Sequence, residues 1–176
     1  TSRLGGHPER GKVPGVEAST GALGHGVPIG VGISLAMRLQ KRKSRVFVLT
    51  GDGEINEGSN WEAAMAAAKH KLSNLTVLVD YNKLQSYGRT ADVLDLEPLS
   101  DKFESFGFVT HEVDGHDVSA LEKIFKKLPF SKEAPSAIIC HTVKGKGFPF
   151  AEGNPEWHHK SGLTEDDFRK MYECLQ

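Results

Sequence analysis

Residues 46–53 read Val46-Phe47-Val48-Leu49-Thr50-Gly51-Asp52-Gly53, and this stretch decides the fold. Its β-branched and aromatic residues predict a buried strand over 45–50, which Gly51-Asp52-Gly53 then ends in a loop. A second apolar run, Leu75–Val79, ends in the polar residues Asp80-Tyr81-Asn82. Strands that are continuously apolar are typical of a parallel sheet covered on both faces.

The rest of the chain alternates in the same way. Apolar runs at 108–113 and 136–141 predict two more strands, and helices are expected over 28–39, 61–71, 116–128 and 165–175. Ser59 stands three residues before Glu62, a spacing that indicates a capping box at the start of the second helix. The glycine- and proline-rich segments 1–27 and 144–162 are expected to be ordered loops. We therefore predict an α/β fold, a parallel sheet flanked by helices on both faces.

Length and charge limit the classes of function. The 176 residues are expected to form a single domain, 1–176, that begins within a longer protein, because Thr1 leads directly into the glycine-rich stretch. A net charge of −1 gives no reason to expect nucleic acid or an anionic membrane as a partner. No apolar run reaches the roughly 20 residues that a membrane span needs. The two cysteines, Cys140 and Cys174, have no metal-type spacing and fit a cytoplasmic protein.

Two of the predicted strands end in oxygen-bearing side chains. Asp52 follows the first strand and Asn82 follows the second, so a parallel arrangement brings both to one edge of the sheet. Hard cations such as Mg²⁺ prefer oxygen ligands and are often completed by phosphate oxygens. A lone Gly-Asp-Gly is usually a simple turn, but the paired pattern favours a site for a metal and a phosphate.

This pattern resembles the Gly-Asp-Gly…Asn motif of thiamine-diphosphate enzymes. The resemblance implies that Mg²⁺ (or Ca²⁺ or Mn²⁺) is held by Asp52, Asn82 and the backbone carbonyl of Leu84. It further implies that Gly53, Glu54 and Asn82 belong to the binding site of thiamine diphosphate, with Gly53 against the diphosphate.

The surrounding sequence resembles transketolases in particular, from about residue 5 to about residue 162. The segments that carry this likeness are Gly6-His7-Pro8-Glu9, Pro14-Gly15-Val16-Glu17, Ser19–Gly24, Glu54–Ala63, Val113–Asp117 and Lys144–Gly147. By resemblance His7 faces the thiazolium ring and the hydroxyls of the donor sugar. Gly21, Ala22 and Leu23 line the aminopyrimidine.

The resemblance to transketolases also implies roles for three further residues. His158 matches a histidine that contacts cofactor or substrate, so His7 and His158 are the expected catalytic residues. Glu57 and Glu62 match acidic residues that transketolases place at the subunit interface, between two active sites.

Each of these residues also has a structural alternative. His7 precedes a proline and can simply anchor a turn, and Glu62 is explained equally by the capping box. His158 has a neighbour, His159, and the sequence leaves open which of the two reaches the site. Lys144–Lys146 fits a solvated loop as well as a loop beside a diphosphate.

The resemblance implies transfer of a two-carbon ketol unit from a ketose to an aldose, with sugars or sugar phosphates as substrates. The pyrimidine-binding domain, which supplies the activating glutamate in this family, is absent from the chain. We therefore expect it to be inactive alone, either as half of a split transketolase in an α₂β₂ assembly or as a fragment. Alternatives are 1-deoxyxylulose-5-phosphate synthase, dihydroxyacetone synthase, a 2-oxo-acid dehydrogenase E1 component, or a non-catalytic paralogue that keeps the fold.

Overall fold

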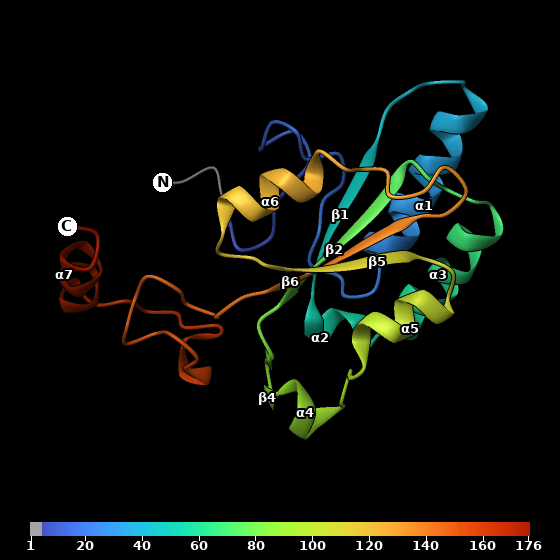
Figure 1. Ribbon diagram of the computed structural model, residues 1–176. Coiled ribbons are helices and arrows are strands. Elements are labelled where there is room, and N and C mark those ends of the chain that lie inside the picture. Colours follow the sequence, from blue (N-terminus) through green and yellow to red (C-terminus); the bar gives the residue numbers. More distant parts are fainter. Residues whose placement is uncertain (1–4) are drawn as a thin grey trace.

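A four-stranded parallel sheet forms the centre of the molecule. The computed structural model describes residues 5–176, and Figure 1 shows the strands lying side by side with helices around them. The strands are β1 (Val46–Gly51), β2 (Leu75–Tyr81), β5 (Val109–Asp114) and β6 (Ser136–His141), in the order β1-β2-β6-β5. All three pairings are parallel, which confirms the predicted α/β class. The first four residues of the expected loop 1–27 lie outside the described residues.

Three helices cover one face of the sheet. They are α1 (Gly26–Leu39), α3 (Gly58–Lys69) and α5 (Leu99–Ser105). Their side chains pack on the fully buried Val77 and Val79 of β2 and on Ile139 of β6. This face holds the larger of the two apolar clusters, so it contributes most of the buried apolar area that stabilises the fold.

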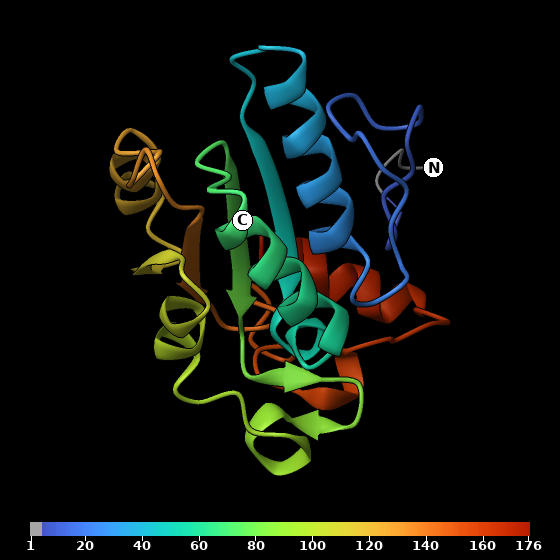
Figure 2. The same cartoon turned by 90° about the vertical axis from the view of Figure 1, so that its right-hand side faces the viewer.

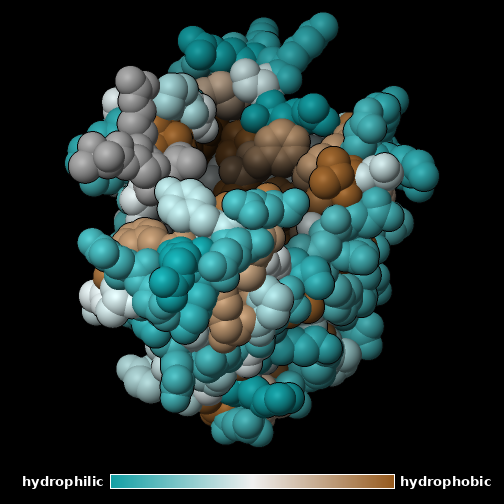
Figure 3. Space-filling view, turned by 90° about the vertical axis from the view of Figure 1, so that its left-hand side faces the viewer, coloured by the Kyte–Doolittle hydropathy of each residue, from teal (hydrophilic) through white to brown (hydrophobic). Residues whose placement is uncertain are grey.

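The opposite face is covered by α6 (Val118–Phe125). Ile124 of this helix packs on Ile138 and Cys140 of β6, and Asp117 caps its first turn by accepting a hydrogen bond from Ala120 N at 3.0 Å. The cover is uneven, since Leu49 of β1 is 73% exposed. Figure 3 shows this side of the molecule, where apolar side chains line a hollowed region.

The capping box predicted at the start of α3 is wrong. The helix begins at Gly58 with Glu57 as its N-cap, and no side chain caps it. The hydroxyl of Ser59 instead donates a hydrogen bond to the carbonyl of Gly24 at 2.6 Å. The hydroxyl thus donates to a distant carbonyl instead of accepting from a backbone N–H of its own helix. A complete capping box is present in α7 (Glu165–Glu173), between Thr164 and Asp167.

Besides α5, several short elements lie where the sequence predicted no helix or strand. They are α2 (Asp52–Ile55), the antiparallel pair β3 (Leu84–Gln85) and β4 (Gly88–Arg89), α4 (Thr90–Val93) and the 3-10 turn η1 (Pro155–Trp157). Figure 2 shows the β3–β4 hairpin beyond the carboxyl end of β2. None of the helices in residues 5–176 is both long enough and apolar enough to span a bilayer.

The absence of a side chain at Gly30 allows α1 to lie close to β1. A Cβ added at Gly30 would lie 2.4 Å from Val48 Cγ2, whereas one added at Gly32 meets nothing within 4 Å. Gly30→Ala should lower the free energy of unfolding by about 1–3 kcal/mol, because the buried Val48 has no room to move.

The matched control is Gly32→Ala in the same helix. Because alanine has the higher helix propensity, this change should raise the free energy of unfolding by about 0.5–1 kcal/mol. Urea unfolding of both variants is the measurement. Equal effects of the two substitutions would contradict close packing at Gly30.

Candidate functional site

The parallel register brings the ends of β1 and β2 together. Gly51 pairs with Asp80, so the chain leaves both strands at the same edge of the sheet. Asp52 is the first residue after β1, and Asn82 is the first after β2. The predicted convergence of these two residues is therefore present, at the carboxyl edge where ligands of open parallel sheets bind.

Asp52 is a buried carboxylate held by backbone groups. It is 1% exposed; its Oδ1 accepts a hydrogen bond from Gly53 N at 2.7 Å, and its Oδ2 accepts one from Lys83 N. The pKa of this carboxyl is raised, mainly by burial and further by the charge of Asp80, although the two backbone donors and the charge of Lys144 lower it in part. Among the described residues no lysine, arginine or histidine forms an ion pair with Asp52. A buried, unpaired anion of this kind is suited to binding a cation.

A tight turn after β2 carries two more oxygens at this edge of the sheet. Asn82 Oδ1 accepts a hydrogen bond from Leu84 N at 3.0 Å, and Lys83 between them has a φ of 65°. The donor set is one carboxylate, one carboxamide and the main-chain carbonyl of the buried Leu84, all of them oxygens that suit Mg²⁺.

The donor set is also incomplete without a ligand. Within residues 5–176 no group of three or more His, Cys, Asp or Glu side chains is arranged so that it could hold a metal ion by itself. Phosphate or water oxygens would have to complete an octahedral shell, as is usual for protein-bound Mg²⁺. The residues present therefore fit a metal bound together with a phosphate group.

Gly53 and Glu54 follow Asp52 in α2 and have clear structural roles. A Cβ at Gly53 would lie 2.7 Å from Gln85 Cβ, so glycine lets the β3 strand pack against α2. Glu54 Oε1 accepts a hydrogen bond from Gly24 N at 3.1 Å, and burial raises the pKa of this carboxyl. Glu54 thus ties the loop before α1 to the edge of the sheet.

His7 and Gly21 lie against each other although they come from separate motifs. A Cβ at Gly21 would be 3.2 Å from His7 Cγ, and the φ of Gly21 is +125°, which favours glycine. Leu23 of the same loop is 57% exposed, and Ala22 is also exposed. The structure therefore brings together two residues that sequence reasoning assigned to one site, on an open surface.

His158 is the more buried of the two neighbouring histidines. Its Nδ1 is buried without a hydrogen-bond partner, whereas the His159 side chain is exposed. Ser86 Oγ lies 3.4 Å from His158 Nε2 and 3.2 Å from His159 Nε2. Burial and the nearby charge of Lys144 lower the pKa of His158. The hairpin after Asn82 thus contacts both histidines, of which His158 is the more buried.

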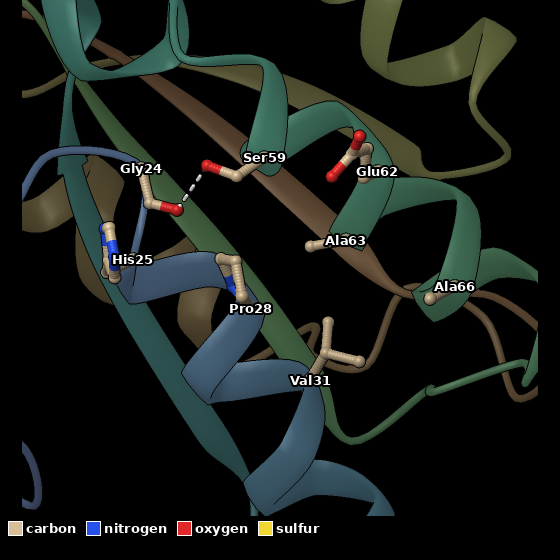
Figure 4. A pocket seen from close by; sticks show the side chains of 8 residues that line it. All are labelled: Gly24, His25, Pro28, Val31, Ser59, Glu62, Ala63 and Ala66. Carbon is tan, nitrogen blue, oxygen red and sulfur yellow. Dashed lines mark hydrogen bonds between the residues drawn. The ribbon is translucent and has the colours of Figure 1, made fainter.

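Glu62 lines a groove between α1 and α3, and Glu57 lies against Gly24, which lines the same groove. The groove has a volume of about 420 Å³ and is lined by Gly24, His25, Pro28, Val31, Ser59, Glu62, Ala63 and Ala66. Figure 4 shows the hydrogen bond from Ser59 to Gly24 at its end and small side chains of α3 facing α1. Both glutamates are exposed, so the structure leaves them free to meet another surface.

Sequence reasoning missed Gln85 and Ser86. Both lie in the β3–β4 hairpin, directly after the predicted metal ligand Leu84, in a segment for which no helix or strand was predicted. The signal that could have found them is their position: two polar residues immediately beyond the Asn82 turn must lie near whatever that turn binds.

Comparison with known proteins identifies the family. Residues 1–175 match the family described as transketolase, thiamine diphosphate binding domain. This chain belongs to the transketolase family. A transketolase from Campylobacter jejuni superposes on 98% of the chain with a TM-score of 0.86 at 31% sequence identity, and this chain covers 28% of that protein.

Two curated relatives in the transketolase family are named as subunits. An apulose-4-phosphate transketolase subunit from Actinobacillus succinogenes is 49% identical over 160 residues, which is 90% of this chain and 57% of that protein. The 6-deoxy-6-sulfo-D-fructose transketolase subunit SqwG of a Clostridium species is 36% identical over 170 residues, which is 97% of this chain and 62% of that protein. The chain therefore spans about six tenths of the length of these relatives.

The residue before Asn82 provides a test of how the turn is anchored. Tyr81 donates a hydrogen bond to Glu97 Oε1 at 2.6 Å, and this bond holds the pKa of Glu97 below its usual range. The ionised Glu97 contributes its full stability at pH values above the ordinary pKa of glutamate. This stability is lost as the pH falls through the lowered pKa that Glu97 has in the folded chain. Tyr81→Phe should cost about 1 kcal/mol at pH 7, and the cost should shrink below about pH 4.

Urea unfolding at both pH values measures this difference. Tyr87→Phe is the control, because Tyr87 is 89% exposed and should show no effect at either pH. A cost for Tyr81→Phe that is independent of pH would contradict the assigned bond to an ionised Glu97.

Proposed function

We propose that this chain is the diphosphate- and metal-binding subunit of a transketolase that moves a two-carbon ketol unit from a ketose to an aldose. The observation that carries the proposal is the buried Asp52 carboxylate at the turn shared with Asn82 and Leu84. A drifting scaffold would have no reason to keep a buried, unpaired carboxylate there, since such a group is costly unless something binds it. This argues against a non-catalytic paralogue.

The metal in this proposal is Mg²⁺, with Ca²⁺ or Mn²⁺ as substitutes. Asp52 and Asn82 would bind it through side-chain oxygens and Leu84 through its main-chain carbonyl. Gly53 and Asn82 would lie against the diphosphate, and the positive charge of Lys144 acts against the burial that raises the pKa of Asp52. The bound metal would offset the repulsion between the negative charges of the Asp52 carboxylate and the diphosphate.

The remaining residues would bind and orient the other end of the cofactor and the sugar. Bound thiamine diphosphate supplies the carbanion stabilisation that ketol transfer needs. Gly21, Ala22 and Leu23 would line the aminopyrimidine, and Glu54 would keep their loop in place through its bond to Gly24. His7 and His158 would hold and move protons at the hydroxyls of the donor, which suits a side chain that titrates near neutrality.

We propose a pyrimidine-domain subunit as the partner, in an α₂β₂ assembly in the cytoplasm. Both relatives are named as transketolase subunits, which supports a second chain, and the two cysteines of this chain are free thiols. The groove between α1 and α3 offers the partner a mostly apolar surface, with Glu57 and Glu62 beside it. Charges at such a rim favour orientation of a partner more than raw affinity.

The donor in this proposal is a ketose with an anionic end. One relative is named for apulose-4-phosphate and another for 6-deoxy-6-sulfo-D-fructose, so both names specify a phosphate or sulfonate on the sugar. The assembled enzyme should transfer a two-carbon unit from apulose-4-phosphate to an aldose, and the chain alone should transfer none. Absence of transfer from any anionic ketose by the assembled enzyme would contradict the transketolase assignment in favour of another thiamine-diphosphate enzyme.

The metal ligands can be tested without turnover. Asp52→Asn should abolish Mg²⁺-dependent binding of thiamine diphosphate, because a neutral carboxamide cannot replace the carboxylate of the site. Calorimetry with and without Mg²⁺ measures the loss. Asp92→Asn, an exposed aspartate in α4, is the matched control and should bind as the unmodified chain does. Unchanged Mg²⁺-dependent affinity in Asp52→Asn would refute the metal assignment.

A further inference from the structure

The side chain of Gln85 has a polar group that nothing in the described chain uses. Its Nε2 is buried and has no hydrogen-bond partner. Leaving a buried amide donor unpaired costs roughly 1–3 kcal/mol. Residues that keep such a group usually do so because a ligand, an ion or a water completes it.

The position of this amide points to the ligand. Gln85 follows Leu84 in β3 and packs on Gly53, where an added Cβ would lie 3.0 Å from Gln85 Oε1 and 2.7 Å from its Cβ. The side chain of Gln85 therefore packs on α2, with its Oε1 toward Gly53, the residue proposed to face the diphosphate. The backbone of Gln85 pairs with Gly88 in the antiparallel hairpin, and this pairing fixes the position of the residue.

The backbone N–H groups near Gln85 already donate hydrogen bonds to protein side chains. Gly53 N and Lys83 N both donate to Asp52, and Leu84 N donates to Asn82. A diphosphate bound at this edge needs donors of its own, and the side chain of Gln85, which packs on Gly53, carries a donor that no group of the described chain uses. A neutral amide has a further advantage, because it donates to a phosphate oxygen without repelling the metal.

We propose that Gln85 donates a hydrogen bond from Nε2 to a diphosphate oxygen of the bound cofactor. This inference rests on the proposed function, since it needs the diphosphate at Gly53. It assigns a cofactor contact to the hairpin side chain directly after the metal-ligating turn, in addition to the contacts made by Asp52, Asn82 and Leu84.

The probe is magnesium pyrophosphate, which carries the diphosphate chemistry without the rings. Titration of the full chain by calorimetry gives its Kd. Gln85→Met, which keeps the length of the side chain and removes the donor, should weaken binding by roughly ten- to a hundredfold, as expected for a hydrogen bond to a charged group. Gln85→Glu should weaken it further, because an acceptor anion would face the diphosphate.

A thermal unfolding scan of the ligand-free chain separates this role from a structural one. Gln85→Met should leave Tm unchanged or raise it, because the variant loses an unpaired buried donor. A structural role predicts a lower Tm instead. Tyr87→Phe, in the turn of the same hairpin and 89% exposed, is the control and should alter neither Kd nor Tm.

Three results would overturn the proposal. An unchanged Kd in Gln85→Met, with the unmodified chain binding the probe, would refute the role of Gln85 and leave the proposed function standing. Tighter binding in Gln85→Glu would mean that the side-chain oxygen binds the metal. Failure of the unmodified chain to bind magnesium pyrophosphate at all would refute the proposed function together with the inference.

Discussion

The hydrogen bond from Lys83 N to the buried carboxylate of Asp52 is the interaction on which the rest of the site depends. It joins the loop after β1 to the turn after β2, and so it fixes the distance between Asp52 and Asn82. The bond forms because parallel pairing sets Gly51 opposite Asp80 and leaves both chains to turn at one edge. Everything proposed about metal and diphosphate follows from this juxtaposition.

The four strands of the sheet and the helices α1, α3, α6 and α7 could be predicted because their signals are local, whereas the short helix α5 was not predicted. Continuous apolar runs gave the four strands of the sheet, and the ends of β1 and β2 gave Asp52 and Asn82 as neighbours. The capping box at Ser59 failed for the opposite reason. The Ser59 hydroxyl donates to Gly24, 35 residues away, and no periodicity in the sequence reports such a tertiary acceptor.

The β3–β4 hairpin and the contacts of Ser86 could not be predicted for a similar reason. Two-residue strands are too short to show an alternating pattern, and their pairing depends on the turn around Lys83 and on packing against α2. For the residues whose roles were assigned through family resemblance, the structure shows only where they lie. The adjacency of His7 and Gly21 is visible in the structure, whereas their contact with a cofactor stays a prediction.

The site is built from groups that lower the stability of the ligand-free chain. The buried Asp52 carboxylate, the unpaired Gln85 amide and the unpaired His158 Nδ1 all cost free energy unless a ligand completes them. They lie around one edge of the sheet, on α2, on the hairpin and on the loop after β6. Local destabilisation of this kind is a common feature of functional sites, because evolution retains it only where binding restores the loss.

The most direct test of the central claim is the position of the metal in a crystal structure with thiamine diphosphate and Mn²⁺, which is located by its anomalous scattering. The account predicts one metal bound by an Asp52 carboxylate oxygen, Asn82 Oδ1 and the Leu84 carbonyl oxygen, each at about 2.1–2.2 Å as for a small octahedral divalent cation, with diphosphate oxygens completing its shell. A metal bound elsewhere, or a diphosphate bound without contact to Asp52 and Asn82, would contradict it.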